Sequence, residues 1–93
     1  MDLVFKALSD LNRRKLVDAL YIKDGQTLAE LSAGLSSMTR FGAMKHLRIL
    51  ESAGLIVTRK EGRRKLHFLN PMPIQRIHDR WLSKFSLPAQ PPR

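Results

Sequence analysis

The sequence contains no cysteine, which excludes disulfide bonds, cysteine-ligated zinc and reactions that use a thiol nucleophile. It also has no apolar run close to the ~18 residues that a membrane-spanning helix requires. The chain starts with Met1 and Asp2 and lacks the basic start of a signal peptide. Together these absences predict a cytoplasmic protein with no membrane partner.

Acidic residues are also scarce: 8 Asp and Glu stand against 17 Lys and Arg, so the formal net charge is +9. A small domain with such an excess is attracted to polyanions, which include DNA, RNA and anionic membrane surfaces. A chain of 93 residues forms one domain and buries only about 60–65% of its unfolded surface. A core of this size is often completed by a second subunit.

Helical patterns fill the first part of the chain. Apolar residues recur at helical spacing from residue 3 to residue 11, which predicts a first helix. Asp10 is suited to be the N-cap of a second helix that ends near residues 23–25. Thr27 and Glu30 match a capping box, which predicts the start of a short third helix reaching Leu35.

After a turn at residues 36–38, a fourth helix is expected from about Thr39 to Ala53. Gly54 occupies the position where a left-handed residue ends a helix, as in a Schellman motif. Residues 55–60 and 63–69 predict a β-hairpin with a glycine turn.

Pro71 and Pro73 are expected to end the second strand and to start a fifth helix, and a flexible Pro-rich tail is expected at 88–93. The expected fold is therefore mainly α with a small β-hairpin. It is a winged helix-turn-helix of five helices and a two-stranded wing, formed by residues 1–87.

The third and fourth helices would form the helix-turn-helix, with the fourth helix in the major groove of DNA. At 100° per residue, the face of this helix opposite its apolar side carries Phe41, Lys45 and Arg48. Base contacts are expected from Arg40, Phe41, Gly42 and Lys45. Contacts to phosphates or the minor groove are expected from Thr39, Arg48, Arg59, Lys60, Arg63 and Arg64. Charge on one helix face alone is equally consistent with a solvated surface.

The basic hairpin makes DNA binding the favoured interpretation over a merely solvated helix face. Residues 59–65 contain five basic residues and one acidic residue. Residues 40–65 hold eight Lys and Arg and two Glu, so about a quarter of the chain carries six of the nine net charges. A basic hairpin alone can simply protect an edge strand, but directly after a helix-turn-helix it is typical of a wing.

The histidines do not predict a metal or catalytic site. His46, His67 and His78 fall on three different elements, without the HxxxH or HxH spacing of zinc ligands. No set of nucleophile and base and no phosphate-binding glycine loop is present in the sequence. We therefore expect no enzyme activity, no metal and no cofactor.

The apolar stripe of the expected fifth helix has two interpretations. It can cover the core of its own subunit, or it can meet a second copy of the chain. A terminal helix with a Trp and a Phe on so small a domain favours the second interpretation. The expected homodimer interface consists of Leu3, Val4, Leu8, Ile74, Ile77, Trp81 and Phe85.

Taken together, these segments resemble the ArsR family of bacterial winged-helix repressors. The most specific match is the block KHLRILESAGLI at residues 45–56. Weaker matches are residues 5–10 leading into Arg13 and Arg14, residues 28–35, the wing at 59–64, and Leu69 with Asn70. The resemblance covers about residues 3–85.

The resemblance implies a homodimer built on the first and last helices. It would bind a palindromic DNA operator, including that of its own promoter, and repress transcription on the bacterial nucleoid. Many family members sense metal through a Cys-x-Cys motif, but Thr27 and Ala29 occupy those positions here. Others bind zinc on the last helix, where this chain has only the adjacent His78 and Asp79. The chain therefore resembles a metal-independent branch.

Two alternatives stay open at this point. One is a sensor repressor whose small-molecule ligand occupies a site that the sequence does not reveal. The other is a winged-helix module that binds RNA or a protein partner, and it would show no preference for palindromic duplex DNA.

Overall fold

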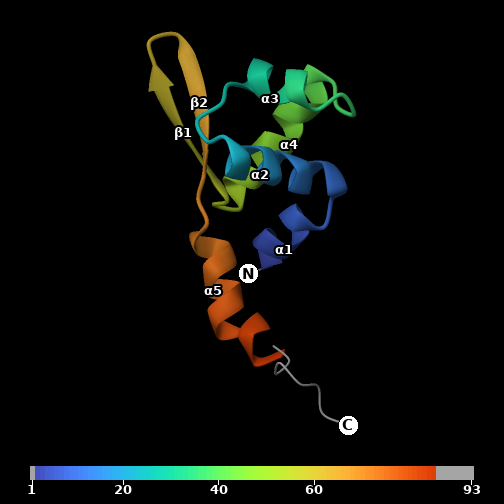
Figure 1. The fold of residues 1–93 in the computed structure, drawn as a ribbon, viewed down its shortest axis with the longest axis vertical. Coiled ribbons are helices and arrows are strands. Elements are labelled where there is room, and N and C mark those ends of the chain that lie inside the picture. The colour runs from blue at the N-terminus through green and yellow to red at the C-terminus, as the bar shows by residue number, and fades with distance from the viewer. Residues whose placement is uncertain (1, 86–93) are drawn as a thin grey trace.

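The computed structural model describes residues 2–85, and Figure 1 shows a helical body with a hairpin at one end and the last helix at the other. The elements in chain order are α1 (Asp2–Leu8), α2 (Leu11–Ile22), α3 (Leu28–Gly34), α4 (Arg40–Ser52), β1 (Ile56–Glu61), β2 (Arg64–Leu69), α5 (Met72–Arg80) and the 3₁₀ turn η1 (Leu82–Phe85). Five helices and a two-stranded hairpin confirm the predicted fold class. The expected tail at 88–93 lies outside the described residues. No described helix is long and apolar enough to cross a membrane.

The starts of α2 and α3 agree with the sequence prediction, but α1 ends at Leu8, so Leu11, which was predicted on the first helix, is the first residue of α2. The Asp10 carboxylate accepts hydrogen bonds from the backbone amides of Asn12 and Arg13 at the start of α2. The capping box of α3 is complete, because Thr27 Oγ1 accepts from the Glu30 amide at 3.1 Å and Glu30 Oε1 accepts from the Thr27 amide at 2.8 Å. These bonds satisfy amides that no helical carbonyl can reach.

The Schellman motif after α4 is also present. Gly54 has a φ of 78°, its amide donates to the carbonyl of Glu51, and the Leu55 amide donates to the carbonyl of Leu50. Leu50 and Leu55 are both fully buried, so the motif turns the chain into the core before β1 begins.

One core joins the helical body to the base of the hairpin. Leu16, Leu20, Leu31 and Leu50 each lie at or below 1% exposure, and they come from α2, α3 and α4. Fully burying such side chains contributes about 1.5–3 kcal/mol each, so the core holds α4 against α2 and α3. The buried apolar residues are Val4, Ala7, Leu16, Val17, Leu20, Leu31, Ala43, Leu47, Leu50, Leu55, Ile56, Leu66 and Ile77.

The hairpin pairs in antiparallel register from Ile56 with Leu69 to Glu61 with Arg64. Its loop is Gly62–Arg63, one residue further along than the Glu61–Gly62 turn that we predicted, and Gly62 has a φ of 61°. The segment before α3 adds a single antiparallel bridge between Gln26 and His67, which attaches the base of the wing to the helix-turn-helix.

The C-terminal helix differs from the prediction. α5 ends at Arg80, so Trp81 and Phe85 do not continue the stripe of Ile74 and Ile77 on one helix. The Trp81 ring instead packs edge-on against Phe5 of α1, with 5.8 Å between ring centroids, and against Phe85 at 5.6 Å. Edge-to-face aromatic packing is favourable, and it accompanies the turn of the chain into η1.

Candidate nucleic-acid interface

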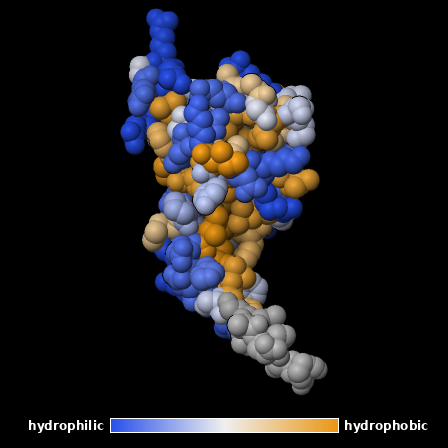
Figure 2. Space-filling view, viewed as in Figure 1, coloured by the Kyte–Doolittle hydropathy of each residue, from blue (hydrophilic) through white to orange (hydrophobic). Residues whose placement is uncertain are grey.

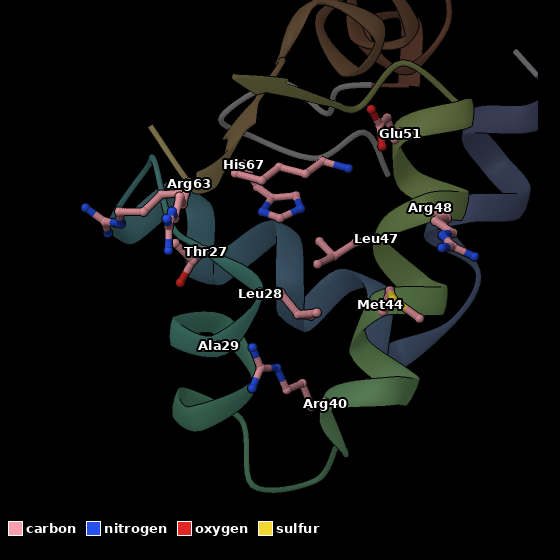
Figure 3. Close-up of a pocket in the computed structure, with 12 residues that line it drawn as sticks. Thr27, Leu28, Ala29, Arg40, Met44, Leu47, Arg48, Glu51, Arg63 and His67 are labelled. Atoms are coloured by element: carbon pink, nitrogen blue, oxygen red, sulfur yellow. The ribbon is translucent and has the colours of Figure 1, made fainter. Parts of the chain in front are cut away.

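A hollow of about 440 Å³ lies between the start of α3, one face of α4 and the hairpin (Figure 3). Its apolar floor includes Leu28, Ala29, Met44 and Leu47. Five cationic side chains line it as well, and they come from two separate elements: Arg40, Arg48, Arg63, Arg64 and Lys65. Positive charge around a concave surface raises the local concentration of an anionic partner.

On α4, Arg40, Met44 and Arg48 line this hollow and follow the four-residue repeat of a helix face, and Leu47 and Glu51 line it beside them. Phe41 and Lys45 lie on the adjoining face. Phe41 is 65% exposed, and the Lys45 ammonium lies 5.3 Å from the centroid of its ring. A cation over an aromatic face is a favourable contact, so this pair presents an apolar surface and a charge together.

The start of α4 is set by Thr39. Its hydroxyl oxygen accepts a hydrogen bond from the Gly42 amide at 3.0 Å, which makes it the N-cap. A Cβ at position 42 would lie 3.2 Å from that same hydroxyl. The near neighbour of Gly42 is therefore the cap of its own helix.

The predicted wing cations fall into two groups. The Arg59 guanidinium stacks over the Phe68 ring at 4.8 Å, and an Arg64 nitrogen lies 3.5 Å from Glu30 Oε1. Lys60 and Arg63 are exposed at the end of the hairpin. The wing therefore combines cations held by neighbours within the chain with cations that extend into solvent.

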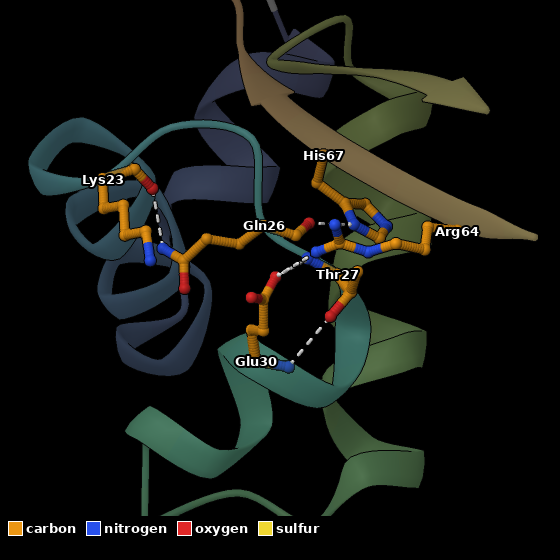
Figure 4. A network of polar contacts seen from close by, with 6 residues as sticks. All are labelled: Lys23, Gln26, Thr27, Glu30, Arg64 and His67. Atoms are coloured by element: carbon orange, nitrogen blue, oxygen red, sulfur yellow. Dashed lines mark hydrogen bonds and ion pairs between the residues drawn. The ribbon is translucent and has the colours of Figure 1, made fainter. Parts of the chain in front are cut away.

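Glu30 connects the wing to α3 (Figure 4). The same carboxylate accepts from the Thr27 amide and faces Arg64. The hydrogen bond from the Thr27 backbone, followed by that from the Thr27 hydroxyl and the charge of Arg64, lowers the pKa of Glu30. The carboxylate is therefore ionised at neutral pH and keeps Arg64 close to the N-terminal turn of α3. The ion pair is solvent-exposed, so it adds little to stability.

Each histidine has a separate environment. His67 is buried on β2, and its Nδ1 lies 2.9 Å from the Gln26 carbonyl oxygen. His46 Nδ1 lies 3.2 Å from Arg13, and His78 Nδ1 lies 3.3 Å from Asp79. Within residues 2–85, no three His, Cys, Asp or Glu side chains gather closely enough to hold a metal ion.

The structure brings four of the predicted DNA contacts around one hollow: Arg40, Arg48, Arg63 and Arg64. Arg59 lies outside it and stacks on Phe68 instead. Eight other residues that line the hollow were not among the predicted DNA contacts, and they include Met44 on α4 and the cationic Lys65 on β2. The four-residue spacing from Arg40 to Arg48 points to Met44, whereas the involvement of Lys65 depends on the hairpin register.

The predicted dimer residues divide between core and surface. Val4 and Ile77 are buried within the subunit, and Ile74 packs against the same core. Leu3, Trp81 and Phe85 are exposed by 63%, 42% and 61%. Figure 2 shows an apolar band running from the body towards the C-terminal end of the described chain, while the hairpin end is hydrophilic.

A helix-turn-helix followed by a basic hairpin defines the chain as a winged helix-turn-helix DNA-binding domain. Residues 8–59 match a helix-turn-helix domain family. The HTH-type transcriptional regulator YuzN of Bacillus subtilis is 35% identical over 86 residues, covering 87% of this chain and 94% of the relative.

Solved structures identify the family. The crystal structure of an ArsR family transcriptional regulator is 30% identical, with a TM-score of 0.75, and the match covers 90% of this chain and 84% of that one. The homodimeric winged helix-turn-helix DNA-binding domain Mb0332 from Mycobacterium bovis shares the fold, with a TM-score of 0.71 at 23% identity and coverage of 90% and 76%. The chain belongs to the ArsR family of transcriptional regulators, which is not a class of enzymes.

Proposed function

We propose that the protein is a homodimeric repressor that binds a palindromic operator, including one in its own promoter, and that it does so without sensing metal. The observation that carries this proposal is the hollow between α4 and the wing, around which cations from both elements converge. A duplex placed there would meet α4 in its major groove and the hairpin beside it. Repression follows from occupancy, because a dimer bound over a promoter excludes RNA polymerase.

Within this proposal, α4 and the wing have different tasks. Arg40, Phe41, Gly42 and Lys45 contact base edges, since they lie at the N-terminal end of α4. The phosphate and minor-groove contacts come from Thr39, Arg48, Arg59, Lys60, Arg63 and Arg64. Arg64 exchanges its contact with Glu30 for a phosphate when DNA binds, at little cost because the ion pair is exposed.

The surface formed by Leu3, Phe5, Trp81, Leu82 and Phe85 supports the dimer. These five apolar side chains are all exposed, and the aromatic contacts between Phe5, Trp81 and Phe85 join α1 to η1. Exposed apolar side chains joined across two elements are typical of an interaction surface. The Mycobacterium bovis relative is itself homodimeric. We refer to these five residues below as the dimer surface.

Two observations support independence from metal. The chain has Thr27 and Ala29 where sensing members of the family carry cysteines. On α5, His78 and Asp79 contact each other, and Asp79 also accepts from Gln75. These side chains are engaged in local hydrogen bonds of the helix.

Selection of bound duplexes from a random pool tests the proposal directly. We expect an inverted repeat to be enriched, and we expect the same repeat upstream of the protein's own coding sequence. Specific binding should exceed binding to a scrambled duplex by at least about 10³-fold at physiological salt. Lys45→Ala should weaken enrichment of the repeat. Enrichment of single-stranded RNA, or of no sequence at all, would contradict the proposal.

A further inference from the structure

Arg13 joins three helices on the side of α4 that faces α1 and α2. Its backbone amide donates to the Asp10 carboxylate at the start of α2. Its Nε donates to the carbonyl oxygen of Ala7 at 2.7 Å, and its Nη2 donates to that of Lys6 at 3.2 Å. The remaining nitrogen, Nη1, lies 3.2 Å from Nδ1 of His46 on α4. One guanidinium therefore connects the end of α1 to the middle of α4.

The contacts of Arg13 with the carbonyl oxygens of Ala7 and Lys6 are ordinary helix capping. The last carbonyls of a helix lack partners within the helix, and a cation there is favourable. Arg14 makes a similar contact, with its Nη1 donating to the carbonyl oxygen of Leu8 at 2.6 Å. The contact with His46 is different in kind, because it adds nothing to the capping of α1 and reaches a helix that carries proposed DNA contacts.

The chemistry of the pair fixes its direction. A guanidinium is always protonated and can only donate, so Nδ1 of His46 must accept and the neutral ring must carry its proton on Nε2. The planar fork of Arg13 then holds the α1 carbonyls and His46 in one defined arrangement. His46 is half-buried and follows Lys45 directly on α4. A contact that holds His46 therefore also holds the part of α4 that carries Lys45.

The first half of α1 belongs to the dimer surface. Leu3 and Phe5 lie on α1, and Phe5 packs edge-on against Trp81. A short helix of seven residues thus carries part of the dimer surface and is attached through Arg13 to α4. In Figure 1, α1 lies next to α2, on the side of the body where α5 leaves it.

We propose that Arg13 and His46 are positioning residues that set the orientation of α4 relative to α1, and thereby the spacing of the two operator half-sites that one dimer accepts. This inference rests on the proposed function, because it requires a dimer on a two-fold operator. The distance between recognition helices in such a dimer dictates the half-site spacing. A firmly held α4 discriminates between spacings, whereas a loosely held α4 tolerates several.

Substitutions at His46 separate this role from the capping of α1. His46→Ala removes the acceptor and leaves both carbonyl contacts of Arg13 in place. His46→Asn is the matched control, since its side-chain oxygen can occupy the position of Nδ1 and accept the same hydrogen bond. Arg13→Lys provides a second test, because one ammonium can cap α1 but cannot span to His46 as the fork does.

Affinity is measured on operators whose half-sites are moved closer or further apart one base pair at a time, and on a single half-site. We expect the wild type to show one preferred spacing. His46→Ala and Arg13→Lys should bind the preferred operator roughly two- to tenfold more weakly and lose most of the spacing preference. Both should keep the wild-type affinity for the single half-site, and His46→Asn should restore the preference.

A purely structural role would instead lower the unfolding midpoint and reduce affinity equally on every operator and on the half-site. That result would overturn the inference, and so would a wild-type spacing profile in His46→Ala. Sedimentation verifies that the variants are dimeric. If the wild type itself does not prefer an inverted repeat to a half-site, the proposed function fails. If the wild type prefers the inverted repeat but the variants show the same spacing profile as the wild type, only this inference fails.

Discussion

At the scale of single residues, the carboxylates of Asp10 and Glu30 accept hydrogen bonds at helix N-termini, and these bonds lower their pKa values. The backbone hydrogen bond from Arg13 lowers the pKa of Asp10, and the backbone hydrogen bond from Thr27 lowers that of Glu30. Groups with a depressed folded pKa stabilise the protein fully above their unfolded pKa. That contribution is lost as the pH falls through the folded pKa.

We therefore expect the stability of the wild type to fall as the pH drops below about 5. The double variant Asp10→Asn with Glu30→Gln should lose less over the same range, because both amides can still cap but neither titrates. Thermal midpoints at pH 7 and at a series of acidic pH values measure the difference. Parallel curves for the two proteins would show that these carboxylates do not control acid stability.

Two glycines give a second test at this scale. Gly54 has a φ of 78° in the Schellman motif, while Gly34 ends α3 without a positive φ and has open space where a Cβ would be added. Gly54→Ala should destabilise the fold by roughly 1–2 kcal/mol, the cost of a left-handed conformation for an L-residue. Gly34→Ala should be neutral or stabilise by up to ~1 kcal/mol. Urea midpoints compare them, and equal losses would contradict the helix-end argument.

At the scale of elements, removing charges from the wing should lower the affinity for any DNA, whereas removing charges from α4 should lower the preference for the operator. In the proposed complex, the wing contacts the DNA backbone, which is the same in every sequence. Lys60→Ala with Arg63→Ala should thus weaken operator and scrambled DNA alike, and should reduce the salt slope by about 0.9 unit per lost phosphate contact. Arg76→Ala, which removes an exposed charge from α5, is the control and should change neither.

Substitutions in α4 should act on sequence preference instead. Arg40→Ala or Lys45→Ala should cost roughly 1–3 kcal/mol on the operator and much less on scrambled DNA. Titrations at several salt concentrations on both duplexes measure these effects. If the wing variants lost specificity and the α4 variants lost only general affinity, the proposed assignment of base and phosphate contacts would be reversed.

The elements also show what could be predicted from the sequence. Local signals, such as Asp10 and the box of Thr27 and Glu30, are sufficient to place helix starts because the partners lie within four residues. The end of α5 could not be predicted in this way. Ile74 and Trp81 share a helical repeat, but a contact with Phe5, more than seventy residues earlier, competes with the helix. The ion pair of Arg64 with Glu30 is missed for the same reason.

At the scale of the whole molecule, the sequence predicted candidate DNA contacts, but it did not predict the hollow around which some of them lie. The charge excess of residues 40–65 located it, and the hollow arises only when the base of the wing attaches to Gln26 through His67. No local pattern indicates that bridge. A histidine with no predicted role thus attaches the wing to the segment before α3.

The proposed independence from metal also depends on the whole molecule, since ligands would have to be gathered from several elements. We expect stoichiometric zinc neither to bind tightly nor to release operator DNA. A chelator competition assay with the wild type and with His78→Ala measures this. A sub-micromolar zinc affinity that disappears in His78→Ala would overturn the expectation, whereas weak binding shared by both proteins would agree with it.

Assembly is the last property at this scale. Trp81 and Phe85 lie on the dimer surface, exposed by 42% and 61%, while Ile77 of α5 is buried within the subunit. Trp81→Ala with Phe85→Ala should therefore leave the fold largely intact but produce monomers that lose operator binding. Ile77→Ala is the contrasting variant: as a buried residue it should cost about 2–5 kcal/mol of folding stability. Sedimentation at micromolar concentration and urea unfolding distinguish the two effects, and a double variant that stays dimeric would place the interface elsewhere.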